Sequence, residues 1–114
     1  MHELGVTQEM INIALDKAKE VDAKKINRIN LVIGEMSGII DDSVQFYFDF
    51  LSEDTIAHKA ELNFRRVPTK VKCRNCGHSY CPDSTPWNCP KCSQWNAEVI
   101  AGREFYIENM EVDE

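Results

Sequence analysis

The sequence predicts an α+β fold in which two helices flank a small three-stranded sheet and a zinc-ribbon subdomain is inserted. Three observations carry this prediction. Two segments repeat their apolar residues at helical spacing, and three others alternate apolar and polar residues as strands do. Between the last two strand-like segments, all five cysteines lie between Cys73 and Cys92. Such clustering in a short segment indicates a metal site and not a framework of disulfides.

The first helix is predicted from Leu4 to Val21, because apolar residues recur every three or four positions and charged residues fill the opposite face. The second helix is expected to follow Asp41, Asp42 and Ser43, whose side chains can cap a helix amino terminus. Its buried stripe would consist of Val44, Tyr47, Phe48 and Leu51, broadened by Phe46 and Phe50. We therefore expect the rest of the protein to cover this helix well.

The first two strands are predicted over residues 26–35 and 60–67, and Pro68 ends the second because proline has no amide to donate. In the third strand, over residues 103–112, the alternation slips within residues 107–110. The slip indicates a β-bulge or burial on both faces. Since a lone strand is unstable, we expect the third strand to join the sheet of the first two.

Residues 69–100 differ in composition from both of their flanks. Cys, Pro, Asn, Ser and Lys become common there and aliphatic residues become sparse. Such a segment cannot bury a core of its own and needs a crosslink or a metal. We therefore divide the chain into an α/β domain of residues 1–68 and 101–114 and a zinc-ribbon domain of residues 69–100.

Charge and composition exclude several classes of function. The net charge of −6 disfavours nucleic acid as a partner, because an acidic surface repels phosphate backbones. The longest apolar run falls short of the roughly 18 residues that a membrane span needs, and no secretory signal is visible. We expect a cytoplasmic protein with no membrane partner. The sequence contains no nucleophile–base pair, phosphate loop or open catalytic metal site, so we expect no enzyme.

The most specific motif is Cys73-Arg-Asn-Cys76, followed after twelve residues by Cys89-Pro-Lys-Cys92. Each pair directs two sulfurs of one short turn at the same point, and two such turns complete a tetrahedron of thiolates. This donor set selects zinc or a single iron. Because four protein ligands leave no open position, we expect a structural zinc ion. A rubredoxin-like iron site and a pair of redox disulfides are the alternatives.

Neighbours of these four cysteines carry weaker signals. Cys81 can be an alternative ligand, a reactive thiol or a small buried hydrophobic residue, of which the last is the default. His78 is expected to donate a hydrogen bond or to face water, and it can also tune or replace a thiolate ligand. Trp87 and Trp95 are expected to cover the core of the zinc ribbon or to serve as contact residues.

The amino terminus, Met1-His2-Glu3, offers a second set of donors. The terminal amine, the amide nitrogen of His2 and its imidazole can close adjacent chelate rings on one ion, and Glu3 can add a backbone nitrogen or a carboxylate. A nitrogen-rich, near-planar set suits Ni(II) or Cu(II) better than zinc. By spacing alone, however, a terminal histidine is more often a solvated side chain.

The Met-His-Glu start, the amphipathic helix, the strand ending Ile33-Gly34-Glu35, the paired cysteines and Gly102-Arg103-Glu104 together resemble the HypA/HybF family. Members of that family are nickel metallochaperones for the maturation of [NiFe]-hydrogenase, and some also serve urease. The resemblance spans essentially the whole chain. It implies that the chain binds Ni(II) as a transient cargo at Met1, His2 and Glu3, with His2 as the essential imidazole, and structural Zn(II) at the four paired cysteines.

The resemblance also implies partners. These are a HypB-type GTPase that cooperates in nickel delivery, the large-subunit precursor of a [NiFe]-hydrogenase and, in members that serve urease, urease maturation proteins. The chain itself would be a monomer or a homodimer. In some members a carboxylate after the first strand approaches nickel, and Asp41 or Asp42 would be the local candidates. Both are equally suited to capping the second helix.

Two other classes of function remain open. A zinc-ribbon module of a nucleic-acid or transcription complex is favoured by the basic residues Lys70, Lys72, Arg74 and Lys91. It is disfavoured by the acidic chain and by the lack of a basic stripe studded with aromatic residues. An iron redox protein would be coloured, whereas a zinc protein is colourless.

Overall fold

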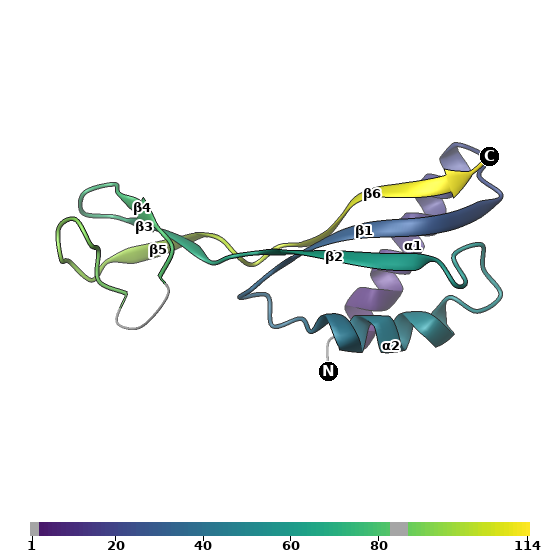
Figure 1. Ribbon diagram of the computed structural model, residues 1–114, viewed down its shortest axis with the longest axis horizontal. Helices are drawn as coiled ribbons and strands as arrows, with labels where there is room; N and C mark the ends of the chain where they lie inside the picture. Colours follow the sequence, from purple (N-terminus) through teal and green to yellow (C-terminus); the bar gives the residue numbers. More distant parts are fainter. Residues whose placement is uncertain (1–2, 83–86) are drawn as a thin grey trace.

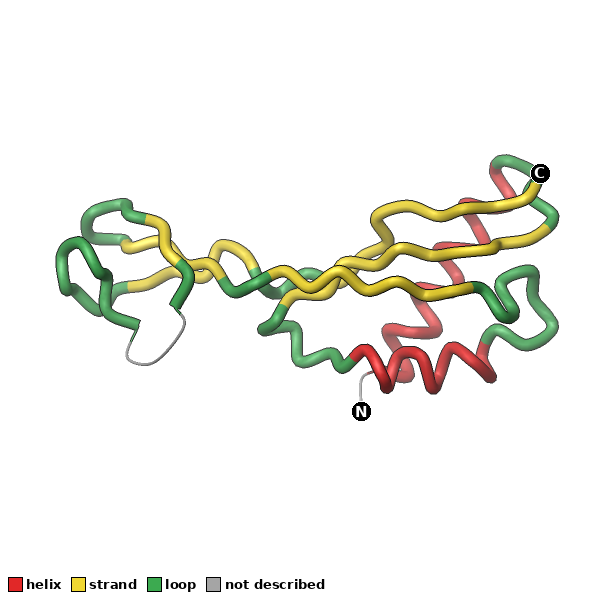
Figure 2. Tube along the Cα trace, in the orientation of Figure 1, coloured by secondary structure: helices red, strands yellow, loops and turns green. Residues whose placement is uncertain are grey.

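Two three-stranded sheets follow one another along the long axis of the molecule, which measures 54 × 28 × 17 Å (Figure 1). This computed structural model describes residues 3–82 and 87–114. The larger sheet has the strand order β2-β1-β6, and the smaller sheet has the order β4-β3-β5. The α+β prediction is therefore confirmed, with a three-stranded sheet and two helices in the larger unit (Figure 2).

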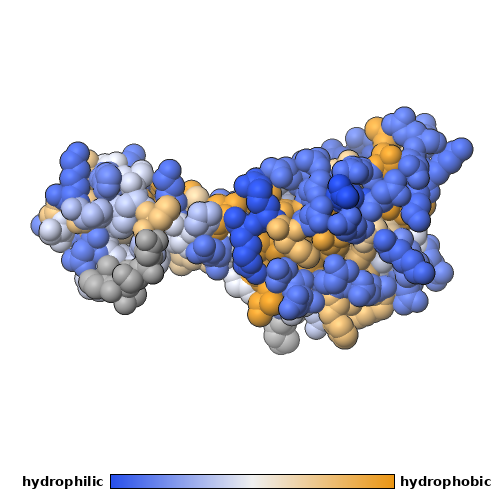
Figure 3. Space-filling view, in the orientation of Figure 1, coloured by the Kyte–Doolittle hydropathy of each residue, from blue (hydrophilic) through white to orange (hydrophobic). Residues whose placement is uncertain are grey.

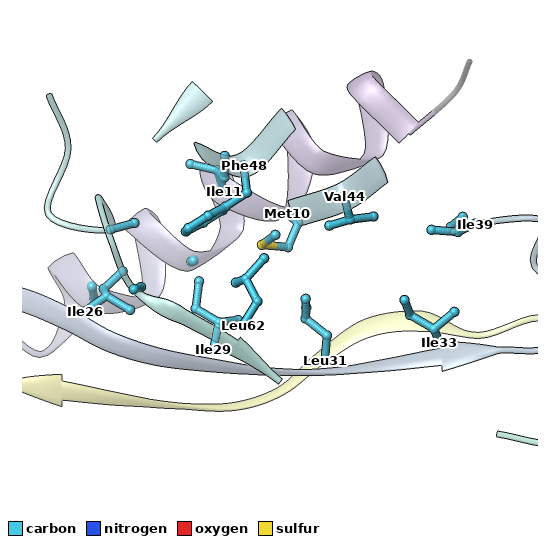
Figure 4. Close-up of a cluster of buried hydrophobic side chains, with 14 residues drawn as sticks. Met10, Ile11, Ile26, Ile29, Leu31, Ile33, Ile39, Val44, Phe48 and Leu62 are labelled. Atoms are coloured by element: carbon cyan, nitrogen blue, oxygen red, sulfur yellow. The ribbon is translucent and has the colours of Figure 1, made fainter. Parts of the chain in front are cut away.

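The larger unit contains α1 (Glu3–Glu20), β1 (Lys25–Gly34), α2 (Asp41–Leu51), β2 (Glu61–Val67) and β6 (Phe105–Asp113). The smaller unit contains β3 (Lys70–Cys73), β4 (Ser79–Tyr80) and β5 (Ala97–Ala101). Both helices lie on one face of the larger sheet (Figures 1 and 4). The two ends of the smaller unit are continuous with β2 and β6, so it is an insertion between two strands of the larger sheet.

The larger sheet combines one parallel and one antiparallel pairing. β2 pairs parallel to β1, with α2 in the connection between them, and β6 pairs antiparallel to β1 on the other side. Asn30 pairs with Asn109 whereas Leu31 pairs with Ile107, so Glu108 is an extra residue on β6. This β-bulge explains the slipped alternation and confirms that prediction.

The hydrophobic core lies between the helices and the larger sheet (Figure 4). Each element contributes the apolar side of its repeat, and the fully buried members of that core are Ile11, Ala14, Ala18, Ile26, Ile29, Leu31, Ile33, Val44, Phe48 and Ala57. Burial of one large aliphatic or aromatic side chain stabilises the fold by about 1.5–3 kcal/mol. These contacts fix α1 and α2 rigidly on the sheet.

The start of α2 differs from the expectation that Asp41, Asp42 or Ser43 caps it. The cap position is Ile40, which has extended backbone angles and no side-chain cap hydrogen bond. The preceding Ile39 is buried and anchors the chain in the core, so the extended Ile40 occupies the cap and Asp41 becomes the first helical residue. The carboxylates of Asp41 and Asp42 then lie in the first turn, where the helix dipole favours them.

The expectation that α2 is well covered is wrong. Val44 and Phe48 are buried, but Phe46 is 63% exposed and Phe50 is 46% exposed. One helical face already fills the space above the sheet, and no further element packs against the opposite face among the residues that the structure describes. Apolar side chains consequently reach the surface along the edge where α2 runs (Figure 3).

The two units meet at a narrow waist, where Gly34 of β1 lies against Gly102. A β-carbon on Gly34 would come within 2.1 Å of the carbonyl carbon of Gly102, and Gly102 itself has a φ of +117° and packs on Thr69. Backbone hydrogen bonds cross this point from Gly34 N–H to the carbonyl of Glu104 (2.7 Å) and from Met36 N–H to the carbonyl of Gly102 (2.6 Å). The waist is thus a close-packed backbone crossing.

Candidate metal centre

The first Cys-x-x-Cys turn follows β3 directly. The amide of Cys73 donates to the carbonyl of His78 (2.8 Å), and the amide of Gly77 donates to the carbonyl of Cys73 (2.8 Å). Gly77 has a φ of +80°, a conformation that a β-carbon disfavours. The glycine therefore lets the chain reverse directly after Cys76 and return as β4.

The second turn repeats this geometry. The amide of Cys89 donates to the carbonyl of Gln94 (2.9 Å), and the amide of Ser93 donates to the carbonyl of Cys89 (2.8 Å). Ser93 has a φ of +64° and so occupies the position that Gly77 holds in the first turn. Two matching turns thus present two pairs of sulfurs to a common point.

The structure brings all four paired cysteines together. Their Sγ atoms lie within 4.8 Å of one another, with 3.5 Å between Cys73 and Cys92 and 3.6 Å between Cys76 and Cys89. A tetrahedral ion with metal–sulfur bonds of about 2.3 Å requires sulfurs about 3.8 Å apart. The four residues therefore fit a tetrahedral metal ion with little movement. No other group of three or more potential ligands occurs in residues 3–82 and 87–114.

Burial and hydrogen bonds hold the sulfurs in place. Cys73 and Cys89 are each 1% exposed, whereas Cys92 is half-buried and Cys76 is exposed. The amide of Lys91 donates to Cys89 Sγ (3.4 Å), and the side-chain amide of Asn75 donates to Cys92 Sγ (3.6 Å). Such donors stabilise negative charge on sulfur. The exposure of Cys76 leaves one side of the cluster accessible to solvent.

The thiols share one electrostatic environment. Hydrogen bonds from the Gln94 amide and from Asn75 lower the pKa of Cys92 to about 6. The amide of His78 lowers the pKa of Cys76, but desolvation and the three other thiols outweigh it and raise that pKa to about 11. Ionisation is therefore easier at Cys92 than at Cys76, and a bound cation would favour the thiolate form of both.

Two of the neighbouring residues differ from expectation. Cys81 is exposed, so it is not a small buried hydrophobic residue. Trp95 is 69% exposed and does not cover a core. The buried apolar residue of the small sheet is instead Val71. The short sheet and its turns bury Val71 together with Cys73 and Cys89.

His78 and Trp87 have clear partners. The ring of His78 stacks on that of Tyr80, with centroids 5.9 Å apart and an interplanar angle of 13°. The hydroxyl of Tyr80 donates to the carbonyl of Trp87 (2.7 Å), which ties the end of β4 to the chain that leads into the second turn. His78 thus contacts the cluster through its backbone carbonyl, which accepts from Cys73, while its ring packs on Tyr80; the sequence spacing gave no signal for either contact.

The other predicted site, Met1-His2-Glu3, is described only at Glu3, since Met1 and His2 lie outside the described residues. Glu3 is the first residue of α1 and is 6% exposed. The start of α1 lies beside the start of α2 (Figures 1 and 2). There the carboxylate of Asp41 accepts hydrogen bonds from the amide of Asp42 (3.0 Å) and from Arg66 (3.5 Å).

No helix among the described residues is both long and apolar enough to cross a membrane.

Comparisons with known proteins agree with one another. The family model described as "Hydrogenase/urease nickel incorporation, metallochaperone, hypA" matches residues 1–112. Hydrogenase maturation factor HypA of Dehalococcoides mccartyi strain 195 is 53% identical over 114 residues, which cover 100% of this chain and 96% of that protein. Hydrogenase maturation factor HypA of Caldanaerobacter subterraneus is 40% identical over 114 residues, covering 99% of this chain and all of that protein.

Solved structures show the same similarity. The Ni metallochaperone HypA from Helicobacter pylori superposes with a TM-score of 0.72 at 27% identity, covering 99% of this chain and 98% of that chain. A second solution structure, of a HypA protein, gives a TM-score of 0.78 at 26% identity and covers 98% of this chain and 96% of that chain.

Proposed function

The chain belongs to the HypA family of hydrogenase and urease nickel-incorporation metallochaperones, and from this premise we propose that it binds Ni(II) at its amino terminus and delivers it during [NiFe]-hydrogenase maturation. Proteins of this family are metallochaperones and not enzymes. The observation that carries the proposal is the match of the family model over residues 1–112, which includes the Met-His-Glu start.

We propose that nickel is held by the terminal amine of Met1, by His2 and by Glu3. A nitrogen-rich donor set of this kind suits Ni(II). The position of Glu3 supports the proposal, because this residue opens the rigid helix α1 and so attaches the terminal donors to the core. A chelate at the end of a chain exchanges its ion readily, as a carrier requires.

We further propose that the four-cysteine cluster holds zinc as a structural ion. The soft thiolates, the near-tetrahedral spacing of the sulfurs and the absence of an open ligand position in the motif support zinc. Its chemistry there is to neutralise the thiolates and join the two turns. Thiolate ligands persist in a reducing compartment, so we place the carrier in the cytoplasm.

The proposed partners follow from the family. They are a HypB-type GTPase, the large-subunit precursor of a [NiFe]-hydrogenase and, if the chain also serves urease, urease maturation proteins. Support for a hydrogenase as recipient comes from the relatives, which are named as hydrogenase maturation factors, whereas the GTPase rests on the family resemblance alone.

The amino-terminal site is tested by replacing His2 in protein that carries no amino-terminal tag. We expect His2→Ala to abolish tight nickel binding in calorimetric titration while the zinc content, measured by elemental analysis, stays unchanged. His58→Gln, which replaces a histidine outside both sites, serves as the matched control and should bind nickel normally. Wild-type nickel affinity in His2→Ala would overturn the terminal site.

A further inference from the structure

The outer face of α2 exposes a cluster of aromatic rings. Phe46 is 63% exposed and Phe50 is 46% exposed, with ring centroids 5.8 Å apart. The half-buried Tyr47 packs edge-on against both, at 5.3 Å and 5.9 Å. Because positions 46 and 50 are one helical turn apart, the two phenylalanines form one continuous patch. Exposed apolar patches of this kind mark contact surfaces.

Carboxylates frame the same patch. Asp42 and Asp49 fall four residues before and three residues after Phe46, which places them on the same helical stripe, and Glu53 follows in the turn just after the end of α2. The whole of residues 41–54 contains no lysine or arginine. Asp49 lies in the last turn of α2, where the helix dipole disfavours negative charge; the side-chain amide of Gln45 donates to it (2.8 Å), but no basic residue lies in that turn. Among the described residues, the only ion pair that reaches this segment is the one between Arg66 and Asp41 (3.5 Å).

The exposed aromatic rings and the excess of carboxylates are both unfavourable in the free protein, and contact with one partner surface would relieve both. We propose that this face of α2 docks an amphipathic, basic segment of a partner protein. Apolar side chains of that segment would cover Phe46 and Phe50, and its lysines or arginines would pair with Asp49 and Glu53. In such interfaces a central aromatic anchor gives most of the affinity, and the surrounding charges select the partner.

Charge argues against a second copy of the chain, an anionic membrane or a nucleic acid as the occupant of this face. The chain carries a net charge of −6, so two copies repel each other. The basic residues of the small sheet, such as Lys70 and Lys72, do not reverse this, since four thiolates around a divalent ion add a charge of about −2. Anionic membranes and nucleic acids are repelled by the same carboxylates. The inference does not depend on nickel binding.

The docking face also has a defined place in the molecule. α2 begins beside the start of α1, so a segment bound along α2 would lie close to Glu3, the first residue of α1 (Figure 1). A partner that recognised the patch would therefore be held near the start of α1.

The test uses the full chain in its zinc form without nickel. The probe is a synthetic helical peptide with a leucine face flanked by lysines, and a peptide with glutamate in place of lysine is its control. Binding is measured by fluorescence anisotropy, and the contacted residues are mapped by amide chemical shifts. We expect the lysine peptide to bind on α2 and the glutamate peptide to remain unbound. Phe46→Ser/Phe50→Ser should weaken binding about tenfold.

Matched variants separate the patch from net charge. Trp95→Ser/Tyr106→Ser removes two exposed aromatic rings elsewhere, and Glu9→Gln/Glu20→Gln removes the same charge as Asp49→Asn/Glu53→Gln. We expect only the α2 variants to lose affinity. Equal losses in the matched pairs, or shifts that map away from α2, would overturn the proposal. So would self-association of the wild-type chain that Phe46→Ser/Phe50→Ser abolishes, since a second copy would then be the occupant.

Discussion

Gly34 and Gly102 touch through their backbones at the waist of the molecule, with no space for a side chain on Gly34. A β-carbon there would meet the carbonyl carbon and oxygen of Gly102 at 2.1 Å. The neighbouring atoms are backbone atoms held by cross-strand hydrogen bonds, so no flexible side chain can move aside. The relative position of the two sheets therefore depends on this pair.

Gly34→Ala should lower the free energy of unfolding by about 3 kcal/mol, because overpacking against fixed backbone forces the strands apart. Urea denaturation followed by far-UV circular dichroism measures the change. Gly5→Ala is the control, since nothing lies within 4 Å of a β-carbon at this helical position. It should stabilise the protein by about 1 kcal/mol. Equal stability of Gly34→Ala and wild type would contradict the close packing at the waist.

The equivalence of Gly77 and Ser93 predicts opposite effects of two substitutions. Both residues have positive φ, which costs about 1 kcal/mol for a residue with a β-carbon. Ser93→Gly should therefore tighten zinc binding about fivefold, and Gly77→Ala should weaken it about fivefold. Competition with a chromophoric chelator measures both. Changes of the same sign in the two variants would show that the turns are not equivalent.

Loss of a cluster cysteine should disrupt metal binding in the smaller unit and leave the larger unit folded. Cys89→Ser is expected to lose its zinc, because three thiolates and a weakly bound hydroxyl no longer complete the tetrahedron. The helical circular dichroism should persist, since both helices pack on the larger sheet. Cys81→Ser is the control and should keep a full equivalent of zinc, because Cys81 lies outside the cluster. Elemental analysis decides between these outcomes.

Buried apolar side chains should contribute more to the stability of the larger sheet than its surface ion pairs do. Arg28 contacts Glu61 (3.0 Å) and Glu111 (2.8 Å), but all three side chains are more than a third exposed. Hydrogen bonding and charge from these carboxylates raise the pKa of Arg28, which stays positive throughout the accessible pH range. Solvent screening leaves less than about 1 kcal/mol in such a pair.

Glu61→Gln/Glu111→Gln should accordingly change stability by less than about 1 kcal/mol, and by less still in high salt. Ile29→Ala, which removes a fully buried core side chain, should cost about 3 kcal/mol. Thermal unfolding of both variants at two salt concentrations provides the comparison. A larger loss of stability in Glu61→Gln/Glu111→Gln than in Ile29→Ala would contradict the prediction that apolar burial outweighs the ion pairs.

The sequence predicted the elements of the larger unit because their patterns are strongly periodic. The slip near Glu108 even located a bulge. The exposure of Phe46 and Phe50 was not predictable from the same periodicity. An apolar residue beside a helical stripe is assigned to the core from the sequence, whether or not another element covers it in the fold. The cap at Ile40 was missed for a tertiary reason, because burial of Ile39 determines where the helix begins.

The candidate site was predictable to a similar degree. The spacing of the four cysteines is local and specifies convergent turns. Ser93 gave no signal, because serine rarely adopts positive φ, and only its alignment with Gly77 in the two turns explains it. The contact between Gly34 and Gly102 joins residues far apart in the chain, and it emerges only once the strands are paired.

The order of the strands along the chain also sets how long a loop each unit must close to form. Cys73 and Cys92 are 19 residues apart, whereas Asn30 and Asn109, which pair across β1 and β6, are 79 apart. The four sulfurs can therefore meet by closing a much shorter loop than the pairing of β1 with β6 requires. Closing that loop first removes those 19 residues from the loop that β6 must span and saves roughly 0.2 kcal/mol of closure entropy. Metal binding and the completion of the α/β core are therefore only weakly coupled through loop closure.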